Sequence, residues 1–358
     1  MIRLIAPLLI AISGGACAQE QTSPQGTTWE LTRPEAEGID PGGLSAAVSF
    51  VEQDPHGDFR SLVIARNGHL VAEHYFNGNG PDSLVDIRSA TKSITSTLVG
   101  MAIAQGLIPS VETPVMPLFP RYMPIAHDGP QKRAITIEHL LTMSSGLDAN
   151  ADDPESTGYE DRMWESDDWV RFVLDLPMVH EPGEDWSYSS ASSFLAGAAV
   201  EEAAAQNLAG YASDVLFAPL GFGDYQWLET PKGRTVAQGN LSIRARDMAK
   251  IGQLYLDDGR WKNQQLVPQS WIRASVEGRF EVPWNGYDSY GYGWYTHSFD
   301  VNERAFHGFG ASGNGGNKIY VFPKQQLVVV IQSTAYNTNY GQRRSFEVLE
   351  MVLAAVEK

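Results

Sequence analysis

The sequence predicts an α/β (α+β) fold in which strands from both ends of the chain enclose a mostly helical region. Two observations support this. Strand-like segments occur near both ends, and residues 89–259 between them read as helices joined by connections rich in proline and glycine. The chain has 358 residues, of which 43% are hydrophobic, so it can bury a large core in one or two domains.

The first 18 residues are predicted to be a signal peptide. Arg3 precedes an apolar run, residues 4–12, that is too short to span a bilayer. Ala16-Cys17-Ala18 is a small-x-small cleavage site. In a second interpretation, cleavage after Ala16 leaves Cys17, the only cysteine, to carry a lipid. Both interpretations predict export, either to the periplasm or medium or as a membrane-anchored lipoprotein. Neither leaves a disulfide or a thiolate metal site.

The remaining elements follow in chain order. Residues 19–37 are expected to be a flexible segment, and residues 38–358 to form the folded domain. Residues 43–53 predict an amphipathic helix, and residues 61–73 predict a hairpin because Asn67-Gly68 lies between two apolar runs. Near the other end, residues 291–296, 318–322 and 326–333 predict strands, and residues 346–356 predict a closing helix.

The formal net charge of −17 argues against binding to nucleic acids or to anionic membranes, which require basic surfaces. Much of the acidity lies in residues 148–168. Asp148, Asn150 and Asp152 alternate there as in a calcium loop, but Asp153 replaces the required glycine and Tyr159 replaces the bidentate glutamate. We therefore interpret this stretch as a solvated surface insertion or lid, and we expect no metal.

Ser89 and Lys92 form a Ser-x-x-Lys pair at the start of a long apolar run. Residues three apart share one face of a helix, so the spacing places an amine beside a hydroxyl. A serine is a weak nucleophile until a neighbouring group takes its proton. A lysine can take it only if burial lowers its pKa, and the apolar residues 94–103 predict such burial. Ser89 is therefore a candidate nucleophile and Lys92 its candidate base.

Residues 88–93 resemble the nucleophile motif of the penicillin-recognising, β-lactamase-related serine hydrolases. That group includes class C β-lactamases, D-alanyl-D-alanine carboxypeptidases, family VIII esterases and 6-aminohexanoate-dimer hydrolases. Residues 135–147 and 241–250 are similar to a mid-chain helix and a downstream helix entry of the same family. The resemblance implies a β-lactamase/transpeptidase-like antiparallel sheet flanked by helices, an acyl-enzyme mechanism and no cofactor.

The resemblance also implies a second motif that supplies a tyrosine. Residues 187–190 (Ser-Tyr-Ser-Ser) fit the Tyr-x-Asn or Tyr-x-Ser element of the family, which makes Tyr188 the third catalytic candidate. A cationic lysine nearby would stabilise its phenolate and allow it to relay protons. Ser190 stands where lactamases usually carry asparagine, and we expect it to contribute one hydrogen bond to the substrate.

The third motif departs from the family. Lactamases carry Lys-Thr-Gly on a strand beside the nucleophile, whereas residues 307–313 (His-Gly-Phe-Gly-Ala-Ser-Gly) contain no lysine. The alignment register within residues 307–316 stays open. His307 is the expected partial substitute for the missing cation, and the backbone N–H groups of Ser89 and the Ala311 region are the expected oxyanion hole.

These features predict a serine hydrolase that cleaves a small-molecule ester or amide. Since the fixed cation is missing, we expect neutral substrates to be favoured over β-lactams, which carry a carboxylate. A D-alanyl-D-alanine peptidase or weak β-lactamase is the alternative enzyme, and a catalytically silent peptide- or peptidoglycan-binding protein is the alternative without catalysis. No Gly-x-Ser-x-Gly elbow, His-Glu-x-x-His motif or phosphate loop is present.

Overall fold

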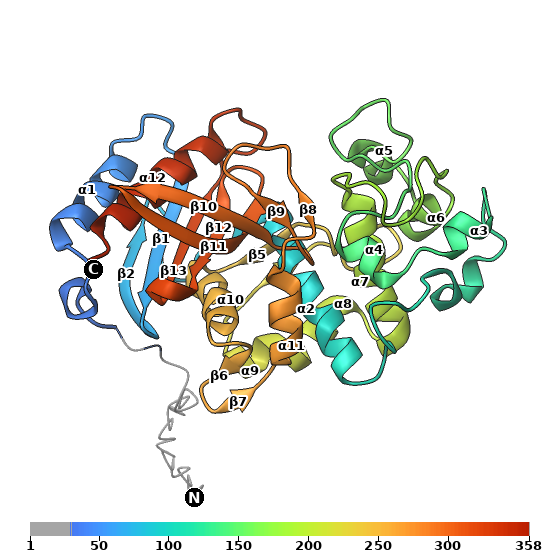
Figure 1. Cartoon of the computed structure of the whole chain (residues 1–358), viewed down its shortest axis with the longest axis horizontal. Helices are drawn as coiled ribbons and strands as arrows, with labels where there is room; N and C mark the ends of the chain where they lie inside the picture. The colour runs from blue at the N-terminus through green and yellow to red at the C-terminus, as the bar shows by residue number, and fades with distance from the viewer. Residues whose placement is uncertain (1–28, 30, 358) are drawn as a thin grey trace, which may run out of the picture.

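An eight-stranded antiparallel sheet forms one half of the molecule, as Figure 1 shows for this computed structural model. The structure describes residue 29 and residues 31–357; the predicted signal peptide lies outside them. In spatial order the strands are β2 (His69–Tyr75), β1 (Phe59–Arg66), β13 (Leu327–Ser333), β12 (Asn317–Phe322), β11 (Arg304–Gly313), β10 (Tyr295–Val301), β9 (Ser289–Tyr290) and β8 (Phe280–Glu281).

Strand β13 is an interior strand of the sheet and is buried along its whole length. Its sequence is almost continuously aliphatic and every residue is buried, as expected of a strand that is covered on both faces. Helices α1 (Pro41–Glu52) and α12 (Gly341–Ala355) cover one face and share an apolar cluster with it. Helix α10 (Ala245–Leu256) packs against the other face.

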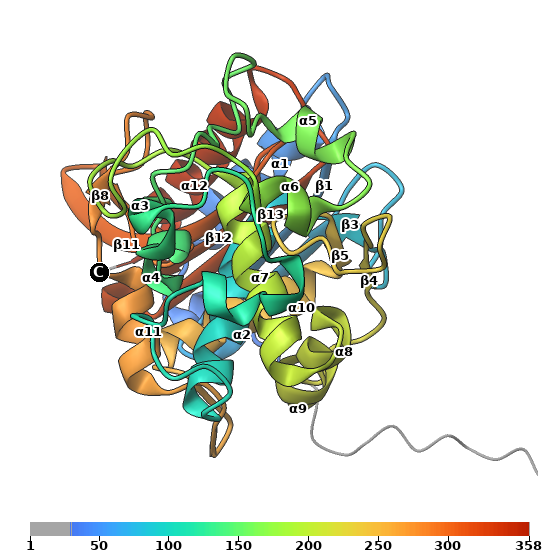
Figure 2. The same ribbon diagram turned by 90° about the vertical axis from the view of Figure 1, so that its right-hand side faces the viewer.

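The second half of the molecule is a helical lobe, which faces the viewer in Figure 2. Its central helix, α7 (Ser190–Ala204), is buried along its first twelve residues and packs against α2 (Thr91–Ala104), the helix that follows Ser89. The other helices here are α3 (Pro130–Arg133), α4 (Ile137–Leu141), α5 (Glu160–Trp164), α6 (Trp169–Leu174), α8 (Leu208–Ala212) and α9 (Ala218–Leu220).

Smaller elements complete the fold. A three-stranded sheet joins β3 (Val85–Asp86), β5 (Leu241–Ile243) and β4 (Gln226–Trp227), and a short ribbon pairs β6 (Arg260–Trp261) with β7 (Gln264–Gln265) before α11 (Gln269–Val276). Among the described residues, no helix combines the length and the apolar character that crossing a bilayer requires.

The predicted hairpin and terminal helices are present. Asn67 and Gly68 both have positive φ, 52° and 81°, as a type I′ turn requires. The end of the segment expected to be flexible packs onto the sheet, where the Thr32 N–H donates to the Leu70 carbonyl. Strand β11 is the main element that the sequence did not predict, because its glycines weaken the pattern expected of a strand.

Candidate active site

Ser89 lies in a strained turn between the two halves of the molecule. It is the middle residue of a single 3-10 turn, Arg88–Ala90, that leads directly into α2. Arg88 has a left-handed φ of 52°, which a non-glycine residue adopts at an energetic cost, and its N–H donates to the Asp86 carboxylate at 2.8 Å. The turn leaves Ser89 half-buried and facing a cavity.

Lys92 lies beside Ser89 and is almost completely buried. Its Nζ donates to the Ser89 hydroxyl at 3.0 Å, to the Gln238 carbonyl at 2.8 Å and to the Ser190 hydroxyl at 3.4 Å. Burial lowers the pKa of Lys92 to about 8, while the carboxylates of Glu160 and Asp152 act in the opposite direction. About one molecule in ten therefore carries a neutral Lys92 at pH 7 and has a base in place.

Tyr188 covers this pair on the loop that enters α7. Its ring centroid lies 5.1 Å from the Lys92 Nζ. Burial raises the pKa of Tyr188 well above its usual value of 10, and the hydrogen-bonding effect of Ser89 offsets only part of this rise. The phenolate expected from the sequence is therefore wrong, because desolvation outweighs the stabilising effect of a lysine that is itself partly neutral. Tyr188 is a neutral phenol that can donate a proton.

A cavity of about 390 Å³ opens above Ser89. The helical lobe contributes the carboxylates Asp152 and Glu160 and the phenol of Tyr188, and Ser89 comes from the turn before α2. The remaining wall comes from the sheet, α12 and the adjoining loops. The residues that line the cavity are Ser89, Asp152, Glu160, Tyr188, Trp284, Asn285, Tyr287, Tyr295, Ser312, Gly313, Asn314, Gly315, Asn337, Thr338, Gln342 and Phe346.

The end of β11 borders the cavity next to the turn that carries Ser89. Ser312, Gly313 and Asn314 line the cavity, and a Cβ at Gly313 would clash with the Ile87 carbonyl oxygen and lie 3.1 Å from the Ala90 nitrogen. Only glycine permits this close approach of β11 to the main chain around Ser89. The main chains of the two segments therefore lie close together at the cavity.

The side chains of three predicted binding residues lie outside the cavity, although Ala311 was predicted for the backbone N–H groups of its region and not for its side chain. The side chain of Ala311 is completely buried in the core that faces the helices, and it does not line the cavity. Ser190 is also buried and contacts Lys92 instead of the cavity. His307 is exposed at the opposite end of β11, where it pairs with Ser298 at 3.0 Å, so it cannot replace the missing cation.

Lys318 is the basic residue that the sequence analysis missed. It lies on β12 directly opposite Ser312, and its Nζ donates to the Ser312 hydroxyl at 2.6 Å. Tyr287, Asp152 and Glu160 were missed as well. Tyr287 and Asp152 lie on loops and Glu160 begins α5, and no local sequence motif identifies such neighbours.

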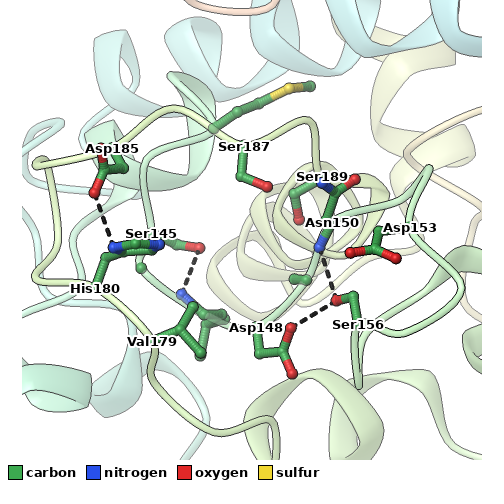
Figure 3. Close-up of a pocket in the computed structure, with 14 residues that line it drawn as sticks. Ser145, Asp148, Asn150, Asp153, Ser156, Val179, His180, Asp185, Ser187 and Ser189 are labelled. Atoms are coloured by element: carbon green, nitrogen blue, oxygen red, sulfur yellow. Dashed lines mark hydrogen bonds and ion pairs between the residues drawn. The ribbon is translucent and has the colours of Figure 1, made fainter.

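A smaller pocket of about 180 Å³ lies next to the loop that carries Ser187 and Ser189 (Figure 3). Ser187 and Ser189 face it, whereas Tyr188 between them faces the larger cavity. Asp148 and Asn150 also line the small pocket, but Asp152 lines the large one. The three residues that resemble a calcium loop therefore do not converge on one point.

One group of side chains on the rim of the small pocket has a metal-like arrangement. His180, Glu184 and Asp185 place their ligand atoms within 4.8 Å of one another, and all three residues are exposed. His180 already pairs with Asp185 at 2.8 Å (Figure 3). Exposed acidic groups of this kind are common without an ion, so we assign no metal to them.

Comparisons with known proteins identify the family of the chain. A profile of the family described as Beta-lactamase matches residues 52–351. The chain is 27% identical over 289 residues to a 6-aminohexanoate-dimer hydrolase of Paenarthrobacter ureafaciens, covering 75% of this chain and 71% of that protein. It is 28% identical over 215 residues to Esterase EstB of Burkholderia gladioli, covering 53% of each. A class C beta-lactamase of Rhodobacter sphaeroides shares the fold with a TM-score of 0.65 and 19% identity, covering 87% of this chain and 100% of that one.

Proposed function

The chain belongs to the beta-lactamase family and is a serine hydrolase, and we propose that it cleaves small-molecule esters or amides through an acyl-enzyme on Ser89. The observation that carries the proposal is the contact between the Ser89 hydroxyl and a buried Lys92 whose pKa lies near 8. A base of this pKa can remove the serine proton and also return it at neutral pH.

The first step is acylation. Neutral Lys92 accepts the Ser89 proton as Oγ attacks the substrate carbonyl carbon. The Ser89 N–H and the backbone N–H groups at the end of β11, next to Gly313, stabilise the oxyanion. The bond to the leaving group then breaks, and the departing oxygen or nitrogen takes a proton from Lys92, with the neutral Tyr188 hydroxyl as the relay.

The second step is deacylation. A water molecule attacks the acyl carbonyl and loses a proton toward Lys92, and the Ser89 oxygen leaves and recovers its proton. Both steps use the same groups, with Lys92 neutral at the start of each.

The two relatives support both esters and amides as proposed substrates. One relative is named for hydrolysis of an aminohexanoate dimer and another is named an esterase. The predicted leader at residues 1–18 favours a substrate that the protein meets outside the cytoplasm. We propose that the reaction takes place in the periplasm, in the medium or at the membrane surface if Cys17 carries a lipid.

The test combines labelling with a substrate screen of the purified protein. A fluorophosphonate should form a covalent adduct on Ser89, identified by mass spectrometry. p-Nitrophenyl esters, nitrocefin and short ω-amino-acid amides then report the preferred bond. An adduct on another serine, or no labelling together with no turnover of any substrate, would contradict the proposal and favour a silent binding protein.

A further inference from the structure

Lys318 is completely buried directly behind the cavity wall. Its Nζ donates to the Ser312 hydroxyl at 2.6 Å and to the Tyr287 hydroxyl, and it lies 4.8 Å from the ring centroids of Tyr287 and Phe346. Ser312, Tyr287 and Phe346 all line the cavity together with Ser89. Lys318 is therefore separated from a bound substrate by one layer of side chains.

The hydrogen bonds leave a donor available on this wall. When Lys318 is protonated it only donates, so it then occupies lone pairs on the Ser312 and Tyr287 oxygens and none of their hydrogens. These two hydroxyls also bond to each other at 2.7 Å, which uses one hydrogen. The remaining hydrogen has the Gln342 Oε1 as its acceptor, at 3.3 Å from Tyr287 or 3.5 Å from Ser312. Both distances are long for O–H···O bonds, so a substrate oxygen can replace Gln342.

The charge around Lys318 favours an anion. Within the described part of the chain, the carboxylates that line the cavity, Asp152 and Glu160, act on Lys92, whereas burial alone accounts for the lowered pKa of Lys318. Lys318 forms no ion pair with a described carboxylate. Burial disfavours the protonated form of Lys318, and a carboxylate bound beside it would stabilise that form, so the bound carboxylate and the lysine proton would favour each other.

We propose that Ser312 and Tyr287, with Lys318 behind them, form a subsite for a carboxylate on the substrate. The inference rests on the proposed function and narrows its substrate class to esters or amides that carry a carboxylate away from the scissile bond. It reverses the expectation, drawn from the missing Lys-Thr-Gly motif, that neutral substrates are favoured. Ser312 and Tyr287 touch the carboxylate, and Lys318 is a positioning residue that acts through them.

Matched chromogenic esters test the subsite. Mono-p-nitrophenyl glutarate carries a carboxylate on the acyl side and 3-butyryloxy-4-nitrobenzoate carries one on the leaving group, and p-nitrophenyl butyrate is the neutral reference. We expect Lys318→Met to raise KM for at least one carboxylate ester by about ten- to a hundredfold, the usual range for hydrogen bonds to charged groups. Its kcat should change much less, and kcat/KM for the butyrate should stay within about threefold.

Lys132→Met is the matched control. Lys132 is another completely buried lysine, but it donates to the carbonyls of Ala126 and Leu174 and lies outside the cavity. This variant should leave the ratio between carboxylate and neutral esters unchanged. Tyr287→Phe provides a second route if Lys318→Met fails to fold, and it should raise the same KM. The subsite would be overturned if Lys318→Met and Tyr287→Phe lowered kcat/KM equally for all three esters, or left the ratio between carboxylate and neutral esters unchanged.

Binding to Ser89→Ala separates this inference from the proposed function. Recognition of the carboxylate does not require turnover, so calorimetry with this variant should still show tighter binding of the carboxylate ester than of the butyrate. That preference should disappear in Ser89→Ala combined with Lys318→Met. A preference without any turnover by the unmodified protein would support the subsite and contradict the hydrolase mechanism. Turnover without a preference that depends on Lys318 would support the hydrolase mechanism and contradict the subsite.

Discussion

Two serine–lysine–tyrosine groups border the same cavity, one where the helical lobe begins and one on the sheet. In the first, the Lys92 Nζ lies 3.0 Å from the Ser89 hydroxyl and Tyr188 covers the pair. In the second, the Lys318 Nζ lies 2.6 Å from the Ser312 hydroxyl and also donates to Tyr287. Both lysines are buried. The three residue types in contact therefore do not by themselves identify a nucleophile.

The difference between the two groups lies in the surrounding charge and in the backbone. The carboxylates Glu160 and Asp152 offset part of the desolvation of Lys92 and hold its pKa near 8, whereas burial lowers the pKa of Lys318 without such an offset. A base near pH 8 can gain and lose a proton during turnover. The strained turn at Arg88 also presents Ser89, while Ser312 lies in a regular strand. We infer catalysis at the first group and recognition at the second.

Replacing each serine in turn is the strongest test of this contrast. Ser89→Ala should lower kcat/KM for p-nitrophenyl butyrate by at least about a thousandfold and remove fluorophosphonate labelling, because the proposed nucleophile is lost. Ser312→Ala should keep the label and most of the butyrate activity. Label on Ser312 in the Ser89→Ala protein would reverse the assignment.

Lys92 and Tyr188 should behave as one catalytic unit. Lys92→Ala and Tyr188→Phe should each lower kcat by about a hundredfold or more, and the double variant should lose little beyond the worse of the two, because one proton path is already broken. Lys318→Met combined with Tyr188→Phe is the control pair, whose effects on butyrate hydrolysis should add. Additive losses for Lys92 and Tyr188 would show that they serve separate steps.

The buried Lys92 should also make stability depend on pH. Its pKa is about 8 when folded and about 10.4 when unfolded, so between these values the unfolded chain binds more protons and stability rises with pH. The gain attributable to Lys92 is about 1–2 kcal/mol between pH 8 and 9.5. Urea unfolding should show a smaller rise over this range in Lys92→Met, and the exposed control Lys324→Met should retain the full rise. Equal slopes in all three proteins would mean that Lys92 titrates normally.

The part of the site encoded by local spacing could be predicted from the sequence. Ser89 and Lys92 are three residues apart at the start of a helix, so their contact follows from helical geometry. The Asn67-Gly68 turn is equally local. The fold class followed from strands at both ends of the chain and helices between them.

The part of the site that depends on the register between β11 and β12 could not be predicted from the sequence. Strand β11 contains glycines that usually weaken strands, and it needs them because a Cβ at Gly310 would lie 2.6 Å from the Ile319 carbonyl oxygen. Unless this strand is recognised, the pairing of Ser312 with Lys318 cannot be predicted, and His307 is then the only basic residue within the third-motif segment. The charge state of Tyr188 was also misjudged, because burial depends on the aromatic residues packed around it.

The carboxylates beside Lys92 offer the finest test of the contrast between the two lysines. Glu160 raises the pKa of Lys92, so Glu160→Gln should lower it and move the rise of kcat/KM with pH toward lower pH. With the pKa near 8, about a tenth of Lys92 is neutral at pH 7, so the gain there is at most about tenfold and should disappear above pH 9. Asp161→Asn is the matched control, since Asp161 is a neighbouring acid that does not line the cavity, and its pH profile should match that of the unmodified protein. Because Lys92 must lose a proton to act, the direction of the shift is decisive: a rise that moves to higher pH in Glu160→Gln would mean that the titrating base is not Lys92.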